Sequence, residues 1–166
     1  RPHGHGTLKR VNGAVYVGAH VRGKRHGHGE FTTQDGSKYV GAWRDGVQHG
    51  DGVFTFGAGT AWAGDVFTGT YVDGQWATGE HKFANGDCYV GDYVNGKQHG
   101  VGKFINANGS AFVGQFQGGL PHGHGGFFMH GKRIPNTTGT YERGLLVHSD
   151  RSVPDDAPEP TLSELR

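Results

Sequence analysis

The sequence predicts an all-β fold, an elongated single-layer antiparallel meander of tandem repeats. An aromatic residue recurs every 23 residues at Tyr16, Tyr39 and Trp62, and the same spacing separates Tyr89 from Phe112. Asn-Gly, Asp-Gly and Arg-Gly pairs punctuate the chain, and 33 of the 166 residues are glycine. Positive-φ turn pairs between short aromatic-rich segments are typical of β-hairpins. A fixed period of this length indicates a repeat architecture.

Each repeat is expected to form one two-stranded hairpin, with no room for a helix between turns. Residues 89–104 show the pattern best: aromatic-x-Gly-x-aromatic-x-x-Gly, three residues, then Gly-x-Gly-x-Phe. About 12–13 strands follow from the turns. Since strand side chains alternate between faces, rings and glycines share one face, where each ring covers a glycine. Three rows of rings are the expected core: Tyr16, Tyr39, Tyr89 and Phe112; Trp43, Tyr93, Phe116 and Tyr141; and Phe31, Phe54, Phe83, Phe104 and Phe127. The opposite face, with Val17, Val40, Val90 and Val113 among polar residues, is expected to be mixed and solvated.

The array is predicted to span residues 1–148 as about six repeats, partial at both ends. A five-residue insertion near residues 65–69 interrupts it, residues 76–79 replace the usual His-Gly-x-Gly, and a second break lies near residues 133–136. Residues 149–166 form an acidic, proline-containing tail. Thr161 and Glu164 fit the capping box of a possible short terminal helix, although the segment is too short to be a stable helix alone. The tail either folds back over an open sheet end or docks on a partner.

Composition excludes several function classes. The net charge is +1, and residues 1–50, with eight Lys/Arg against three acids, carry only +5, which is too little for a nucleic-acid footprint. No apolar run has the length of a membrane span. A single cysteine, Cys88, rules out an intramolecular disulfide and favours a reducing, cytoplasmic setting. The chain begins at Arg1 rather than Met, so a preceding segment stays open.

The repeat resembles the MORN repeat (membrane occupation and recognition nexus). Residues 39–46 with residues 49–54 match that motif at every key position, and the similarity covers roughly residues 3–148. The resemblance implies a protein-interaction scaffold, since such arrays serve in ciliary radial spoke heads, in parasite cytoskeletal collars and as receptors for myosin tails. Some arrays are joined to a lipid-kinase or methyltransferase domain, which this sequence lacks.

No pattern in the sequence makes a case for catalysis. The His26/His28, His122/His124 and His3/His5 pairs suggest zinc. The favoured interpretation is that histidines simply occupy the family's His-Gly position, because zinc sites normally add Cys or carboxylate ligands at fixed spacing; the residues at that position are His26, His49, His99 and His122. Three Gly-x-x-x-x-Gly-Lys segments imitate a phosphate-binding loop without its Ser/Thr or its helix. We therefore expect no enzyme activity, no cofactor and no metal.

The favoured function is a non-catalytic scaffold in a cytoskeletal, ciliary or flagellar (axonemal) assembly. Its partners would be other proteins, with a homodimer as a further option because the sheet has open edges. The partner contact is predicted where the repeat is irregular, at Trp62, Phe67, Tyr71 and Trp76, since tryptophan and tyrosine are favoured at binding hot spots. The alternative is that the insertion buries these rings in the core.

A membrane tether is the second hypothesis. Basic residues in the first repeats would face anionic phospholipid, as junctophilin-type MORN proteins are linked to membranes: Arg1, Lys9, Arg10, Arg22, Lys24 and Arg25. Against it, residues 51–118 carry three Lys/Arg and six acids, and the sequence shows no amphipathic helix or lipidation motif. Solvated turn charge is therefore the favoured interpretation of these residues.

Overall fold

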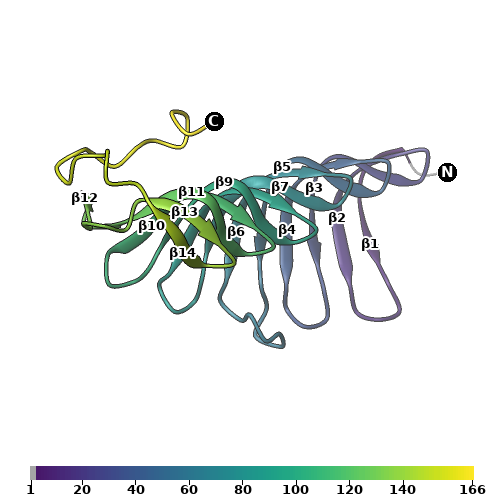
Figure 1. Cartoon of the computed structure of the whole chain (residues 1–166). Coiled ribbons are helices and arrows are strands. Elements are labelled where there is room, and N and C mark those ends of the chain that lie inside the picture. The colour runs from purple at the N-terminus through teal and green to yellow at the C-terminus, as the bar shows by residue number, and fades with distance from the viewer. Residues whose placement is uncertain (1–2) are drawn as a thin grey trace. The chain divides into compact units, whose positions relative to one another are not determined.

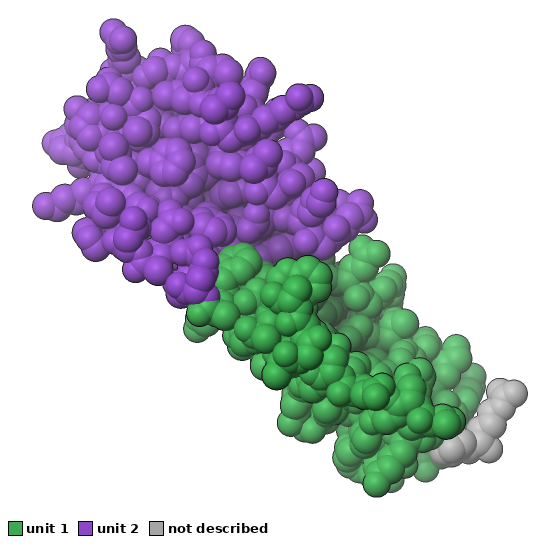
Figure 2. Space-filling model, turned by 90° about the horizontal axis from the view of Figure 1, so that it is seen from below, with its two compact units in different colours: residues 1–84 green, residues 85–166 purple. Residues whose placement is uncertain are grey.

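The computed structural model describes residues 3–166, which contain fourteen strands and no helix (Figure 1). The chain divides into two compact units, residues 1–84 and 85–166 (Figure 2). Unit 1 holds β1 (Gly4–Lys9), β2 (Val15–Val21), β3 (Lys24–Thr32), β4 (Lys38–Arg44), β5 (Val47–Thr55), β6 (Val66–Val72) and β7 (Gln75–Lys82). Unit 2 holds β8 (Cys88–Val94), β9 (Lys97–Ile105), β10 (Ser110–Gln117), β11 (Leu120–Met129), β12 (Lys132–Arg133), β13 (Gly139–Glu142) and β14 (Leu145–Ser149).

Each unit is an antiparallel meander, which confirms the predicted fold class. In unit 1 every strand from β1 to β7 pairs with its sequence neighbours. In unit 2 the order is β8, β9, β10, β11, β13 and β14, and the short β12 pairs with β11 alone. This small β11–β12 hairpin forms at the second break and raises the strand number above the expected 12–13.

The turns are of two kinds, at opposite edges of the hairpins. Asp45 and Gly46 both have positive φ, 50° and 97°, as a two-residue type I′ hairpin turn requires. The other edge carries wider loops such as residues 33–37, where the Asp35 carboxylate accepts a hydrogen bond from the Ser37 amide at 2.8 Å. The Asn-Gly and Asp-Gly signals therefore mark both edges.

The rings cover the glycines, as the alternation predicts. In the β4–β5 hairpin, Gly41 pairs with Gly52, and a Cβ added to Gly52 would lie 2.4 Å from the Tyr39 hydroxyl. That hydroxyl donates to the carbonyl of Ala42 at 2.9 Å. Only glycine leaves room for the tyrosine ring, so the ring and both glycines form one packing unit.

The first two rows of rings are the core, and they interlock edge to face. In unit 1, Trp43 lies 5.3 Å from Tyr16 and 5.2 Å from Tyr39, with interplanar angles of 84° and 89°. Each second-row ring thus joins two successive repeats, and T-shaped contacts of this kind add to the burial. The members of both rows are almost fully buried, including His20 and Tyr71, which the sequence analysis did not assign to them.

The third row differs from the expectation. Its phenylalanines, including Phe31 and Phe54, are only half-buried. In β7 the row is continued by His81, which pairs with Phe67 as Phe54 pairs with Tyr39. Phe83 follows the strand end, so the prediction that placed it in this row was wrong.

The possible terminal helix does not form, in line with the short length of the segment. Thr161 and Glu164 do form the capping-box contacts, with the Thr161 amide donating to Glu164 Oε2 at 2.7 Å. Only one turn follows before the described chain ends, which is too short for a stable helix. The tail instead folds back on unit 2, where Figure 1 shows it running beside the strands.

Candidate functional site

Unit 1 departs from its own repeat in the loop between β5 and β6, residues 56–65. Five residues join β3 to β4, whereas ten join β5 to β6, and this loop extends beyond its neighbours in Figure 1. Phe67 pairs with Phe54 of the preceding strand, as Tyr39 pairs with Phe31. Phe67 therefore holds the first-row position of its repeat. The five extra residues therefore lie in the loop rather than at residues 65–69, and Trp62 is a loop residue rather than a first-row ring.

The four residues predicted to contact a partner fall into two groups. Phe67 and Tyr71 are 0% and 2% exposed, so their rings belong to the core. Trp62 is 61% exposed, and Trp76 is half-buried. Of the four side chains, only these two tryptophans reach the surface of unit 1.

The two tryptophans belong to one group of rings, which we call the loop cluster: Phe56, Trp62, Trp76, His81 and Phe83. The Phe56 ring lies 5.8 Å from Trp62 and 6.1 Å from Trp76, and so links them. Trp76 lies 5.2 Å from His81, which stacks on Phe83 at 4.1 Å. The sequence analysis missed Phe56 and His81, although Phe56 continues the alternation that begins at Phe54.

A buried hydrogen bond between Asp65 and His81 fixes the end of the loop. Asp65 Oδ2 lies 3.1 Å from His81 Nε2, and Asp65 Oδ1 accepts the Ala84 amide at 2.9 Å. Both side chains are less than a tenth exposed. Burial lowers the pKa of His81 below its ordinary value, and the nearby Asp65 carboxylate offsets part of this. The neutral imidazole therefore holds the loop through its N–H group.

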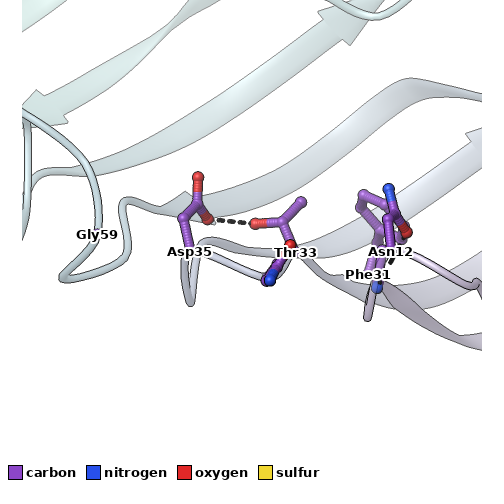
Figure 3. A pocket seen from close by; sticks show the side chains of 7 residues that line it. Asn12, Phe31, Thr33, Asp35 and Gly59 are labelled. Carbon is purple, nitrogen blue, oxygen red and sulfur yellow. Dashed lines mark hydrogen bonds between the residues drawn. The ribbon is translucent and has the colours of Figure 1, made fainter.

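The loop also packs against the neighbouring loop of residues 33–37. The Gly59 amide donates to the Asp35 carbonyl at 3.1 Å, and the Gly57 amide to Ser37 Oγ at 3.0 Å. A shallow pocket of about 550 Å³ opens beside this contact and is lined by Asn12, Ala14, Phe31, Thr33, Gln34, Asp35 and Gly59 (Figure 3). Hydrogen bonds, first from the Thr33 hydroxyl and then from Ser37, lower the pKa of Asp35, so the pocket carries a negative charge.

The basic residues predicted to face lipid are divided between the two edges of the first hairpins. Lys9 and Arg10 lie at one end of β2, and Arg22 and Lys24 at the other, roughly 20 Å away along the strand. All four are exposed. Arg1 lies outside the described residues. These side chains do not form a single patch.

Arg25 is not a solvated charge. Its guanidinium lies 4.1 Å from the Trp43 ring centroid and 5.1 Å from that of Phe31, and it donates to the Gly46 carbonyl at 2.6 Å. Burial lowers the pKa of Arg25, and the charge of Arg10 lowers it further. Arg25 therefore acts as part of the aromatic packing in the first repeats.

Most of the histidine and Gly-Lys residues singled out above lie in the strands and turns of the repeat. Within residues 3–166 no group of three or more His, Cys, Asp or Glu side chains is placed to hold a metal ion. Gly91 lies in β8, Asn95 and Gly96 form a type I′ turn, and Lys97 begins β9. This imitation of a phosphate-binding loop is therefore a hairpin. No helix with the length and hydrophobicity needed to cross a bilayer occurs in the described part of the chain.

Comparison with known families supports the repeat assignment. The family described as MORN repeat matches residues 1–15, 16–38, 39–61, 89–111 and 112–128. No curated protein sequence matches the chain significantly. The family matches leave out residues 62–88, where the structure nevertheless has the β6–β7 hairpin. This hairpin keeps the repeat fold while its sequence has diverged, and it carries much of the loop cluster.

Proposed function

The chain belongs to the MORN-repeat family, and we propose that it is a scaffold whose loop cluster binds a partner protein. MORN repeats are a non-catalytic module, and the proposal extends that absence of catalysis to the whole chain. The single observation that carries it is the exposure of Trp62. This is a large aromatic side chain, 61% exposed, in the one loop of unit 1 that is longer than its counterparts.

The geometry of the loop cluster supports a protein contact. Trp62 lies against Phe56, and Trp76 is half-exposed beside them, so the rings form a continuous apolar surface. The buried contact between Asp65 and His81 anchors the end of the loop. Rigid, partly exposed aromatic rings of this kind are favoured anchors at protein interfaces because they add contact area with little loss of conformational entropy. Without a partner, an exposed apolar surface of this kind would favour aggregation.

The setting we propose is a cytoplasmic cytoskeletal, ciliary or flagellar assembly. This part rests on the family resemblance, since scaffolds of this kind are used there. Its partner is a protein subunit of that assembly. A second copy of the chain is the alternative protein partner.

The test compares protein partners recovered by the full chain and by its Trp62→Ala variant. We expect the variant to lose its partner, with affinity reduced at least about 30-fold, the effect of a typical hot-spot tryptophan. Val11→Ala is the matched control, because Val11 is a fully exposed apolar residue in the equivalent loop between β1 and β2. Mass measurement in solution detects a homodimer in the same samples.

A membrane tether would give a different result. Binding of the chain to phosphoinositide vesicles at physiological salt, lost in an Arg22→Gln/Lys24→Gln variant, would favour lipid over protein. If Trp62→Ala recovered the same proteins as the wild-type chain with equal affinity, the loop cluster would not be the contact and the proposal would fail.

A further inference from the structure

We propose that the C-terminal residues 158–166 are an internal ligand of unit 2, and that the face they cover is a second docking surface. The surface fits an extended segment that carries a carboxylate and, some residues later, a guanidinium. This inference is independent of the loop cluster, which lies in unit 1.

The tail crosses unit 2 through three contacts. Pro158 forms an isolated bridge with Lys132 of β12. Glu159 then pairs with the ammonium group of Lys103 in β9, and Arg166 Nη2 lies 2.6 Å from Asp92 Oδ1 in β8. Lys103 pairs with Val90, and Asp92 lies two residues further along β8, so both charges lie on the face opposite the tyrosine rings.

This face of unit 2 has an apolar centre, which the sequence analysis did not predict. It consists of Val101, Ala111, Val113 and Phe128, all at most 9% exposed. In unit 1 the counterpart of Val113 in the first complete hairpin, Val17, is 38% exposed. The difference follows from what lies on the face. Arg133 lies 5.1 Å from the Phe128 ring, and the start of the tail and residues 133–138 together line a pocket of about 260 Å³.

The charges that hold the tail are specific to this repeat. Glu30 and Val53 take the place of Lys103 in the hairpins of unit 1, and Ala42 takes the place of Asp92. Of the hairpins compared, only β8–β9 carries both a cation, Lys103, and an anion, Asp92. Glu159 and Arg166 of the tail have the opposite charges. Leu162 and Leu165 between the charges are half-buried. Matched charges around apolar side chains favour one orientation of the tail.

A tethered ligand competes with any other. A short linker gives the tail an effective concentration of about 1 mM. A free segment of the same affinity must therefore approach the millimolar range before it displaces the tail, whereas a segment that binds more tightly does so at lower concentration. The tail consequently sets the affinity that another extended segment must exceed.

The first experiment measures the backbone order of residues 157–166 by NMR relaxation of the full chain. At low salt we expect order parameters above about 0.6, the upper bound for flexible backbone. Lys103→Glu should reduce them below this value, and the double change Lys103→Glu/Glu159→Lys should restore them. Lys97→Glu is the matched control, because Lys97 is an exposed lysine of the same strand and has no tail partner. A disordered wild-type tail, or equal effects of Lys103→Glu and Lys97→Glu, would overturn the proposal.

The second experiment tests the surface as a docking site. A synthetic peptide of residues 150–166 is added to the full chain and to Arg166→Glu, whose substitution lies outside the sheet and leaves folding intact. In Arg166→Glu, whose own tail is held less tightly, we expect chemical-shift changes at Asp92, Val101 and Lys103. In the wild-type chain the peptide replaces a tail of the same sequence, so we expect the order parameters of residues 158–166 to fall instead. The wild-type chain should require a peptide concentration at least about tenfold higher, because its tail is a tethered competitor. Equal titrations, or changes elsewhere only, would show that the face is not a docking surface.

Discussion

The rings of Phe67 and Trp76 stack face to face, with centroids 4.2 Å apart and 2° between their planes. Elsewhere in unit 1 the first-row rings meet their neighbours edge to face, as Tyr39 meets Trp43. Trp76 occupies the position of Gln48 in the preceding repeat, since Trp76 pairs with Tyr71 as Gln48 pairs with Trp43. The diverged hairpin therefore has a stacked aromatic pair where its predecessor has an amide side chain.

The stack on Phe67 gives Trp76 a structural role that the exposed Trp62 does not have. Trp76→Ala should lower the free energy of unfolding by about 2–4 kcal/mol, because it removes a half-buried ring and its stack on Phe67. Trp62→Ala should lower it by less than about 1 kcal/mol, since that ring is mostly in solvent. Urea unfolding of both variants measures the difference. Equal losses would mean that Trp62 is part of the core.

The ring-over-glycine unit predicts a strong effect of a single methyl group. Gly52→Ala should cost at least about 2 kcal/mol of stability, because the new Cβ would lie 2.4 Å from the Tyr39 hydroxyl and force the buried ring to move. Gly6→Ala is the control, since no atom lies within 4 Å of a Cβ added there. Its stability should change by about 0.5 kcal/mol or less. Thermal unfolding of the two variants provides the measurement.

The pKa of His81 gives a pH dependence with a definite sign. Because burial keeps the folded-state pKa below the ordinary value of about 6.5, the unfolded chain binds a proton at His81 more readily. The stability that neutral His81 contributes is complete above about pH 6.5 and decreases as the pH falls through the folded-state pKa. Urea midpoints between pH 8 and pH 5 should show this decrease.

A double variant provides the control for His81. Asp65→Ser with His81→Phe introduces the residues that the β4–β5 repeat has at Ser37 and Phe54. The decrease towards low pH should be smaller in this variant than in the wild-type chain. If both proteins lose stability equally, the Asp65–His81 pair does not contribute to the pH dependence.

Arg25 should stabilise the first repeats through its contact with Trp43. Arg25→Gln introduces the side chain that Gln48 provides in the next repeat, and we expect a loss of about 1 kcal/mol from the cation–π contact. Lys24→Gln, a change at the exposed neighbour, should alter stability by about 0.5 kcal/mol or less. Denaturant unfolding compares the two. A similar small effect of both substitutions would assign Arg25 to the solvated surface.

The sequence predicted the features that depend on local geometry. Type I′ turns require positive φ, so the Asp45-Gly46 pair marks a hairpin without knowledge of the rest of the fold. The alternation of Tyr39 and Gly41 similarly determines which residues share a face. Both features repeat along the chain, and the repetition made the fold class predictable.

The irregular parts were less predictable because local patterns permit more than one register. Trp62 lies 23 residues after Tyr39 and is followed by Gly64, so it satisfies the repeat as well as Phe67 does. Only burial of the Phe67 ring decides between them. Arg25 presents a related problem, since its charge predicts a solvated side chain whereas its neighbours in space are rings.

The tail contacts had no local signal at all. Lys103 and Glu159 are 56 residues apart, and neither residue belongs to a recurring pattern. Sequence reasoning therefore gave the composition of the tail and its two possible fates, but not the surface on which it lies. The buried Val113 was missed for the same reason, since nothing in its own hairpin indicates that the face is covered.

The type I′ turns limit where such a chain can accept an insertion. The Gly46 amide donates to the Arg25 carbonyl at 2.9 Å, and Gly74 and Gly144 make the same bond to Gln48 and Pro121 of the repeats before them. An insertion at this edge would break a bond that joins two repeats. The wider loops at the other edge are also joined, as the Gly59 amide joins the Asp35 carbonyl, yet the ten-residue loop 56–65 lies there and keeps that bond despite its extra residues. New binding segments can therefore be grafted, by evolution or by engineering, along one edge of each unit while the other edge preserves the register.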